Sequence, residues 1–315
     1  MIEDSGVEGL RRQQRLIFRC VTGFLLDLVG RQIRRHDGDF TRAVVYMAAI
    51  QASRPPSGGD TDIRPFSVRA IAQSMGLPYE TTRRKIAELE AAGLARRLGD
   101  RGYVVSPATF EGAAYRVDGE ATWRTLRRVI IDLRALQFDF DQFAGGSGLA
   151  AARHLDPDDL TDAANVLVND FLLRVLEGGV EPHGSMLDAV IFATMLLANA
   201  ELLTHDPQLA WTYAGAETPP PDNLRRPATI IGIARPLGLT HETVRRHVRR
   251  HRERGWVRRV TGGYLITQDR IQAPDVLQSG LLISHCFLQL MRSLRQLGVD
   301  PAAIEAVPGP GRPTA

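Results

Sequence analysis

A segment of this 315-residue chain occurs twice, 162 positions apart. Residues 64–99 align with residues 226–261 without a gap, and 13 of the 36 aligned pairs are identical. The identical pairs include Gly-Leu, Glu-Thr and two Arg-Arg dipeptides, in the same order in both copies. Because a repeated segment usually forms a repeated structural unit, we expect two copies of one small fold.

The sequence around the two copies predicts two similar halves. Residues 24–26 resemble residues 171–173, and residues 43–46 resemble residues 189–192. The glycine and serine residues at 144–148 have the composition of a flexible linker. The predicted layout is a first half at 1–145 with the repeated module at 64–107 and a C-terminal helix at 121–143, a second half at 146–300 with the module at 226–268 and a C-terminal helix at 274–297, and a disordered tail at 301–315.

Each copy of the module predicts two helices followed by a hairpin. In the first copy, apolar residues recur at helical spacing in 68–75 and in 82–89. Only Gly-Leu-Pro at 76–78 separates these helices, so they must cross steeply, as in a helix-turn-helix. Short strands are expected at 95–98 and 102–105 in the first copy, and at 256–260 and 264–266 in the second.

The run IAQSMGLPYETTRRKIAELEAAGLARR, residues 71–97, resembles the DNA-binding core of bacterial winged helix-turn-helix transcription regulators. Gly-Leu, Glu-Thr, Arg-Arg and the second Gly-Leu carry this resemblance. In the order of its elements, each half also resembles a MarR-type subunit. The resemblance implies a mainly α fold with small β-hairpin wings, in which two winged helix-turn-helix modules are held by flanking packing helices.

In this family the second helix of the motif enters the major groove, and the resemblance carries that role to matching positions. In the first copy these are Tyr79, Glu80, Thr81, Arg83, Arg84, Lys85, Arg96, Arg97 and Arg101. In the second copy they are His241, Glu242, Thr243, Arg245, Arg246, His247, Arg249, Arg258 and Arg259. Arginine suits guanine edges and threonine hydroxyls suit phosphates, whereas the hairpin arginines are expected on the DNA backbone and Arg101 in the minor groove.

The charge distribution favours double-stranded DNA as the partner. Residues 64–105 contain eight basic and four acidic residues, and residues 225–268 contain eleven and two. The net charge of the whole chain is only +3, so the remainder of the chain is acidic. Two basic segments on an acidic body indicate a polyanionic partner, and the second copy is expected to supply more of the salt-sensitive affinity.

Two of the differences between the copies bear on how the second copy folds. Pro236 stands where the first copy has Ser74, inside the last turn of the first motif helix. A proline there removes a backbone hydrogen bond, so we expect a distorted motif. His251 stands where the first copy has Leu89, so we expect its helix to be less deeply packed.

The sequence contains no pattern that predicts a metal, a cofactor or an enzyme. The nearby histidines 241, 247 and 251 lack cysteine or acidic ligands around them and do not match HExxH. Cys20 and Cys286 are far apart among apolar residues and are interpreted as buried free thiols. The most apolar run, 189–203, is too short to span a bilayer and no secretory leader is apparent, so we expect a cytoplasmic protein without a membrane partner.

We therefore predict a sequence-specific DNA-binding transcription regulator that acts as a single-chain pseudo-dimer, packed through its N- and C-terminal helices. A replication initiator of the plasmid type and a winged-helix protein–protein scaffold of a chromosome-segregation complex remain as alternatives. A homodimer through the apolar N- and C-terminal helices is also open, and the sequence identifies no small-molecule effector. The apolar stripe of the N-terminal helix is interpreted as core or as a subunit seam: Leu16, Ile17, Val21, Phe24, Leu25 and Leu28.

Overall fold

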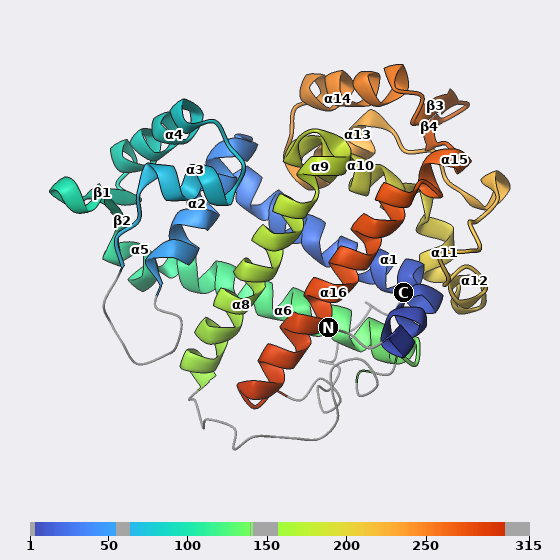
Figure 1. Ribbon diagram of the computed structural model, residues 1–315, viewed down its shortest axis with the longest axis horizontal. Helices are drawn as coiled ribbons and strands as arrows, with labels where there is room; N and C mark the ends of the chain where they lie inside the picture. The colour runs from blue at the N-terminus through green and yellow to red at the C-terminus, as the bar shows by residue number, and fades with distance from the viewer. Residues whose placement is uncertain (1–3, 55–63, 139, 141–156, 300–315) are drawn as a thin grey trace, which may run out of the picture.

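The computed structural model describes residues 4–54, 64–138, 140 and 157–299, and this part of the chain is mainly helical (Figure 1). Its helices are α1 (Asp4–Arg35), α2 (Phe40–Ser53), α3 (Val68–Ser74), α4 (Tyr79–Ala91), α5 (Pro107–Glu111), α6 (Ala113–Ala135), α8 (Pro157–Gly178), α9 (Val180–His183), α10 (Met186–Asn199), α11 (Glu201–His205), α12 (Pro207–Thr212), α13 (Ile230–Leu237), α14 (His241–Glu253), α15 (Gln268–Ile271) and α16 (Pro274–Gln296). Its strands form two antiparallel hairpins, β1 (Ala95–Arg97) with β2 (Tyr103–Val105) and β3 (Val257–Val260) with β4 (Gly263–Ile266).

Six helices form the body of the molecule, and their contacts occur in matching pairs. Helix α1 packs on α6 and α16, and α8 packs on the same two helices. Helices α2 and α10 each contact both α1 and α8. The predicted stripe on α1 is buried in this body, and Phe24 stacks on Phe171 of α8 with ring centroids 6.1 Å apart. The segments 1–145 and 146–300 therefore share one hydrophobic core through their N- and C-terminal helices.

The first module, residues 64–107, contains α3, α4 and the first hairpin. Ser67 caps α3 by accepting the Ala70 N–H at 3.0 Å. Gly76 has φ +58°, a left-handed conformation that lets the chain turn at once into α4. Helix α4 then buries Ile86 and Leu89 against the body, so its opposite face is left to solvent.

The second module, residues 226–268, contains the same elements in the same order. Thr229 caps α13, Gly238 is left-handed with φ +65°, and α14 buries Val244 and Val248. In both modules the second residue before the first motif helix forms a β-bridge with a tyrosine of the hairpin. The bridge joins Phe66 to Tyr103 in the first module and Ala228 to Tyr264 in the second. Figure 1 shows both modules on the same side of the helical body, with α4 and α14 outermost.

The predicted distortion at Pro236 is wrong. Helix α13 continues through Pro236 to Leu237 and ends at Gly238. The Pro236 carbonyl accepts a hydrogen bond from Arg34 Nη1 of α1 at 2.6 Å. A Cβ atom at Gly30 would lie 2.2 Å from the same carbonyl oxygen, so α1 packs directly on this turn and supports it.

Other expectations need smaller corrections. His251 is 0% exposed, as Leu89 is, so α14 is packed as deeply as α4. Helix α6 covers Ala113–Ala135 instead of 121–143, because it begins directly after the short helix α5 and ends before Gln137, which has φ +57°. Helix α16 agrees with the predicted 274–297 within one residue. The predicted linker and the predicted tail lie outside the described residues.

Both cysteines are free thiols; Cys286 is buried, as predicted, and Cys20 is only partly buried. Within the described ranges, no helix has both the length and the apolar character needed to cross a membrane.

Candidate nucleic-acid interface

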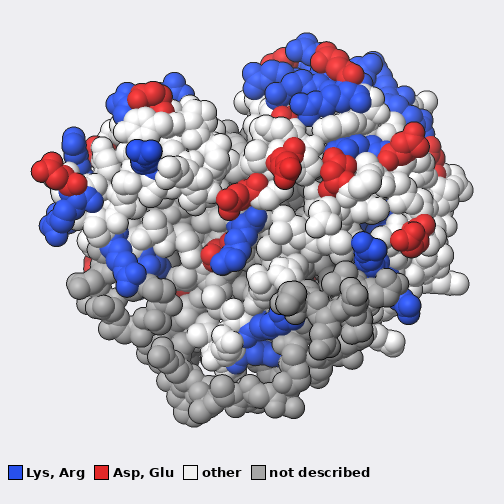
Figure 2. Space-filling model, viewed as in Figure 1, with Lys and Arg blue, Asp and Glu red and all other residues white. Residues whose placement is uncertain are grey.

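The exposed side of α14 carries four arginines, which we call the basic face: Arg245, Arg246, Arg249 and Arg252. Glu242 pairs with Arg245 at 2.9 Å, and Glu253 lies 3.9 Å from Arg249. Both carboxylates are exposed, and exposed ion pairs contribute little free energy, so these arginines remain available to another anion. Figure 2 shows basic side chains gathered over α14 and the adjacent hairpin.

The second hairpin extends the basic face. Arg258 and Arg259 are both exposed on β3, and Arg258 pairs with Asp222 on the flank of the module. An open groove lies between this hairpin and the start of α13, lined by Thr229, Arg259 and Thr261 among others. Hydroxyl groups and a guanidinium beside a groove are suited to hold a phosphate backbone.

The first module presents a mixed surface instead. On α4, Arg83 pairs with Glu80 at 2.9 Å, and Arg84 lies 4.0 Å from Glu88. Tyr79 at the start of α4 is 50% exposed. The hairpin residues Arg96, Arg97 and Arg101 are also exposed, and Figure 2 shows both signs of charge over this module.

The structure corrects the prediction for Lys85, which does not face solvent. Its side chain is 12% exposed, and its Nζ donates to Asp39 Oδ2 at 2.5 Å and to Glu88 Oε1 at 2.9 Å. Burial alone would lower the pKa of Lys85, but its hydrogen bonds to Asp39 and Glu88 outweigh burial and raise it. Asp39 is the N-cap of α2, so Lys85 fastens α4 to the body and is not placed to contact DNA.

His247 is corrected in the same way. It is 4% exposed, and its Nδ1 lies 2.6 Å from Asp188 Oδ1 in the first turn of α10. Burial would raise the pKa of Asp188, but hydrogen bonds from His247 and Ser185 hold it down at about 2. His247 and Lys85 stand at the same position of the repeat, so both modules tie the second motif helix to an acid on the helix beneath. Arg250 Nη2 also reaches Asp188, at 3.5 Å.

A packed cluster of rings and guanidinium groups supports α14 from below. The Arg270 guanidinium carbon lies 3.9 Å from the centre of the Trp256 ring, and that of Arg254 lies 4.8 Å from it. His251 stacks on Trp256 at 5.5 Å. Burial lowers the pKa values of His183 and His251 to about 4, so both are neutral at pH 7. The basic face therefore stands on a closely packed base.

All predicted DNA-binding residues other than Lys85 and His247 have exposed or partly exposed side chains on α4, α14 or the hairpins. The sequence interpretation missed Asp39 and Asp188, which orient these helices. Asp39 precedes α2 as a cap, a local signal, but its pairing with Lys85 spans 46 residues and has no signal in the sequence. Comparison of the chain with protein-family models, curated proteins and solved structures gives no match.

Proposed function

We propose that this protein is a sequence-specific DNA-binding transcription regulator, and that its two modules are winged helix-turn-helix domains of a single-chain pseudo-dimer. The basic face of α14 carries the proposal. It places arginines on the side of the helix away from the core, next to a hairpin that exposes two further arginines, Arg258 and Arg259. Helix α4 carries equal numbers of acidic and basic residues, whereas α14 has more arginines than Glu242 and Glu253 can pair with, and an excess of positive charge suits a polyanion.

In this proposal α14 enters the major groove, which is about 12 Å wide and accepts one helix. Arg245 and Arg246 read base edges, and Arg249 and Arg252 contribute long-range attraction to phosphates. Arg258 and Arg259 of the hairpin rest on the DNA backbone. Helix α4 reads a second half-site about 34 Å away with Arg83, Arg84 and Tyr79. Because the two helices carry different residues, the preferred site is asymmetric.

The test begins with selection of bound fragments from genomic DNA by the purified chain, followed by footprinting. One asymmetric site with two protected patches supports the proposal. Protected arrays of identical repeats would instead favour the replication initiator, and failure to retain any DNA, with a protein partner recovered, would favour the scaffold.

A matched pair of variants tests the residues. We expect the double variant Arg245→Ala/Arg246→Ala to weaken binding by about 1–3 kcal/mol for each lost base contact. Arg128→Ala/Arg174→Ala is the control, because these arginines are also exposed and ion-paired, to Asp132 and Asp170, but lie on helices of the body. Equal losses in both double variants would mean that binding is general electrostatic attraction.

A further inference from the structure

The chain between α10 and the second module is much longer than its counterpart in the first half. Helix α2 ends at Ser53 and α10 ends at Asn199, and each of these residues accepts a backbone N–H of its module's hairpin, at 3.1 and 3.0 Å. From there to the module the chain has ten residues in the first half, 54–63, and 26 in the second, 200–225. We call residues 200–225 the long connection; it contains α11, α12 and a short 3-10 helix.

The long connection carries charge of one sign. Within 201–224 it has no lysine or arginine and four acidic residues: Glu201, Asp206, Glu217 and Asp222. The module that follows is strongly basic, with eleven arginines in 225–268. Acids close to these arginines would weaken the attraction of the module for polyanions, so the positions of the acids decide what the long connection does.

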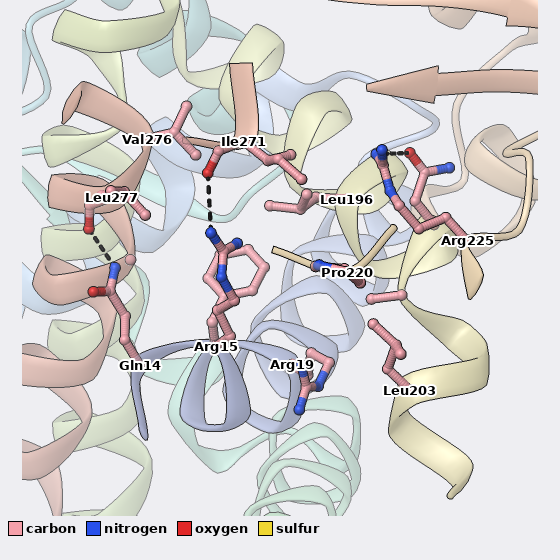
Figure 3. A pocket seen from close by; sticks show the side chains of 14 residues that line it. Gln14, Arg15, Arg19, Leu196, Leu203, Pro220, Arg225, Ile271, Val276 and Leu277 are labelled. Atoms are coloured by element: carbon pink, nitrogen blue, oxygen red, sulfur yellow. Dashed lines mark hydrogen bonds between the residues drawn. The ribbon is translucent and has the colours of Figure 1, made fainter. Parts of the chain in front are cut away.

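Two arginines of α1 and a side chain of α15 fasten the long connection to the body. Arg15 Nε donates to Gly215 O at 3.0 Å. Arg19 Nη2 donates to Ala210 O at 2.7 Å. Pro220, which lies beside these arginines in Figure 3, accepts at its carbonyl oxygen from a side chain of α15 at 2.9 Å. The acids of the long connection are therefore presented from a fixed support.

Asp222 pairs with an arginine of the second hairpin. Its Oδ1 accepts from Arg225 Nη1 at 2.9 Å, and Arg225 Nη2 donates to Ile266 O of β4 at 2.6 Å. The Arg225 side chain is only 2% exposed; burial lowers its pKa, and the charge of Asp222 opposes this change. The other oxygen of Asp222, Oδ2, accepts from Arg258 Nη2 of β3. Asp222 is thus held in place by a buried arginine while it pairs with an exposed one.

Glu201 pairs with a second arginine beside the same hairpin. Its Oε1 lies 3.2 Å from Arg226 Nη1, and both side chains are about half exposed. Arg226 precedes Pro227, whose Cγ would lie 3.9 Å from a Cβ atom at Gly262 in the turn of the hairpin. Arg226 therefore lies near the tip of the hairpin, where an approaching polyanion would meet it.

The first module folds with the same elements but without these two ion pairs. Its arginines at the matching positions are Arg64 and Arg96, and neither forms an ion pair within the described residues. The two acids are therefore not needed to form a module of this kind. Both pairs in the second module are exposed, and exposed pairs contribute little to the free energy of folding. What the acids do change is the charge that the module offers to an outside anion.

We propose that the long connection is an acidic guard, whose two paired acids compete with nucleic-acid phosphates for Arg226 and Arg258. The inference rests on the proposed DNA binding and concerns its strength. Phosphate contacts do not depend on base sequence, so withholding two arginines from them lowers the non-specific affinity. Within the described residues, no acid of the long connection pairs with α14, so contacts of α14 to base edges are kept. The guard thus raises the ratio of specific to non-specific binding.

The test is fluorescence anisotropy of a labelled duplex of random sequence with the full chain at several salt concentrations. We expect Asp222→Asn to bind this duplex about threefold more tightly, as suits the loss of an exposed ion pair, with a salt slope steeper by about 0.9 for one more phosphate contact. Asparagine keeps an oxygen for Arg225 and removes only the charge. Glu201→Gln, which frees Arg226, should change affinity and slope in the same direction.

Glu217→Gln is the matched control. Glu217 is exposed on the same long connection but forms no ion pair within the described residues, so its variant should keep the slope of the unaltered chain. Equal tightening in all three variants would reduce the effect to net charge and overturn the proposal. Unchanged or weaker binding by Asp222→Asn and Glu201→Gln would refute it as well. If Asp222→Asn does not fold, as judged by circular dichroism, Glu201→Gln against Glu217→Gln decides.

The proposed function is judged separately, by the search for a bound genomic site. A chain that protects such a site, and whose variants bind the random duplex as the unaltered chain does, would keep the proposed function and lose the guard. A chain that binds no duplex, with or without these substitutions, would lose both.

Discussion

The two modules share their elements but differ in what they present to solvent and in how they are held. At corresponding positions of the second motif helix, the first module has Glu90 and the second has Arg252. Below that helix, the first module is fastened by Lys85 to Asp39, whereas the second is fastened by His247 to Asp188. The surface of a module and its attachment to the body have thus diverged together.

The turns of the two motifs differ as well. In the first module a Cβ atom at Gly76 would meet nothing within 4 Å, so this turn is open to solvent. In the second, Gly238 and Pro236 pack against Arg34 of α1. The comparison indicates that the second module is fixed to the body at both its turn and its underside, whereas the first is fixed only underneath.

The largest expected difference concerns the two acids below the motif helices. Asp188→Asn leaves His247 and Arg250 without their anion in a place where Asp188 is only 2% exposed. We expect a loss of about 3–5 kcal/mol in the free energy of unfolding, measured with urea. Asp39→Asn is the matched variant; Asp39 is 34% exposed, so we expect a smaller loss. A larger loss for Asp39→Asn would mean that the acid below the first module stabilises the protein more than the acid below the second.

Acid pH should act on the second module through its buried histidines. His183 and His251 have pKa values of about 4 in the folded chain and about 6.5 when unfolded, so only the unfolded chain takes up protons between these values. Stability is therefore fully present above pH 6.5 and falls as the pH falls toward 4. We expect about 2 kcal/mol to be lost at pH 5 for each histidine, relative to pH 7.5.

His251→Leu places the first module's residue in the second. In urea titrations at several pH values it should remove the share of His251, about 2 kcal/mol at pH 5, whereas His183 and the equally shifted His36 of the first module's side keep theirs, since burial lowers the pKa of both to about 4. An unaltered pH dependence in this variant would show that other groups take up the protons.

A smaller effect is expected at the contact between α1 and the second turn. Gly30→Ala places a methyl group 2.2 Å from the Pro236 carbonyl oxygen, so backbone must shift. We expect a loss of about 1–2 kcal/mol, measured by thermal unfolding. Gly23→Ala on the same helix is the control, since its nearest neighbour is Leu197 Cδ2 at 3.8 Å, and it should be neutral or stabilising. Equal behaviour of the two variants would mean that α1 does not support the turn.

The smallest effect is an exchange of one charge between the modules. Arg252→Glu should reduce the salt slope of DNA binding by about 0.9 for a lost phosphate contact, and Glu90→Arg should increase it by as much. Both residues are exposed, so neither variant should change the thermal midpoint by more than a degree or two for a stability change of about 0.5 kcal/mol or less. No change in slope for Arg252→Glu would remove this residue from the proposed interface.

Local chemistry explains what could be predicted from the sequence. The spacing of apolar residues such as Ile86 and Leu89, together with a glycine after each helix, predicts the order of the helices and hairpins. The buried face of α4 and α14 followed from the same spacing. The resemblance places Lys85 and His247 on the side that faces DNA, whereas the structure pairs them with Asp39 and Asp188, acids far from them in the sequence.

Longer-range features could not be predicted, because they depend on how distant segments meet. The support of Pro236 by Arg34, 202 residues away, has no local signature. Pro236 was expected to distort its helix since a proline removes one N–H, but the tertiary contact stabilises the turn.

The packing of α1 on α16 has a consequence for biosynthesis. These helices lie at opposite ends of the described chain, Asp4–Arg35 and Pro274–Gln296, and each covers apolar residues of the other. During translation α1 leaves the ribosome long before α16, which covers part of it. The part of the stripe that α16 covers therefore stays exposed, or bound by a chaperone, until α16 has been made, which makes the nascent chain the stage most prone to aggregation.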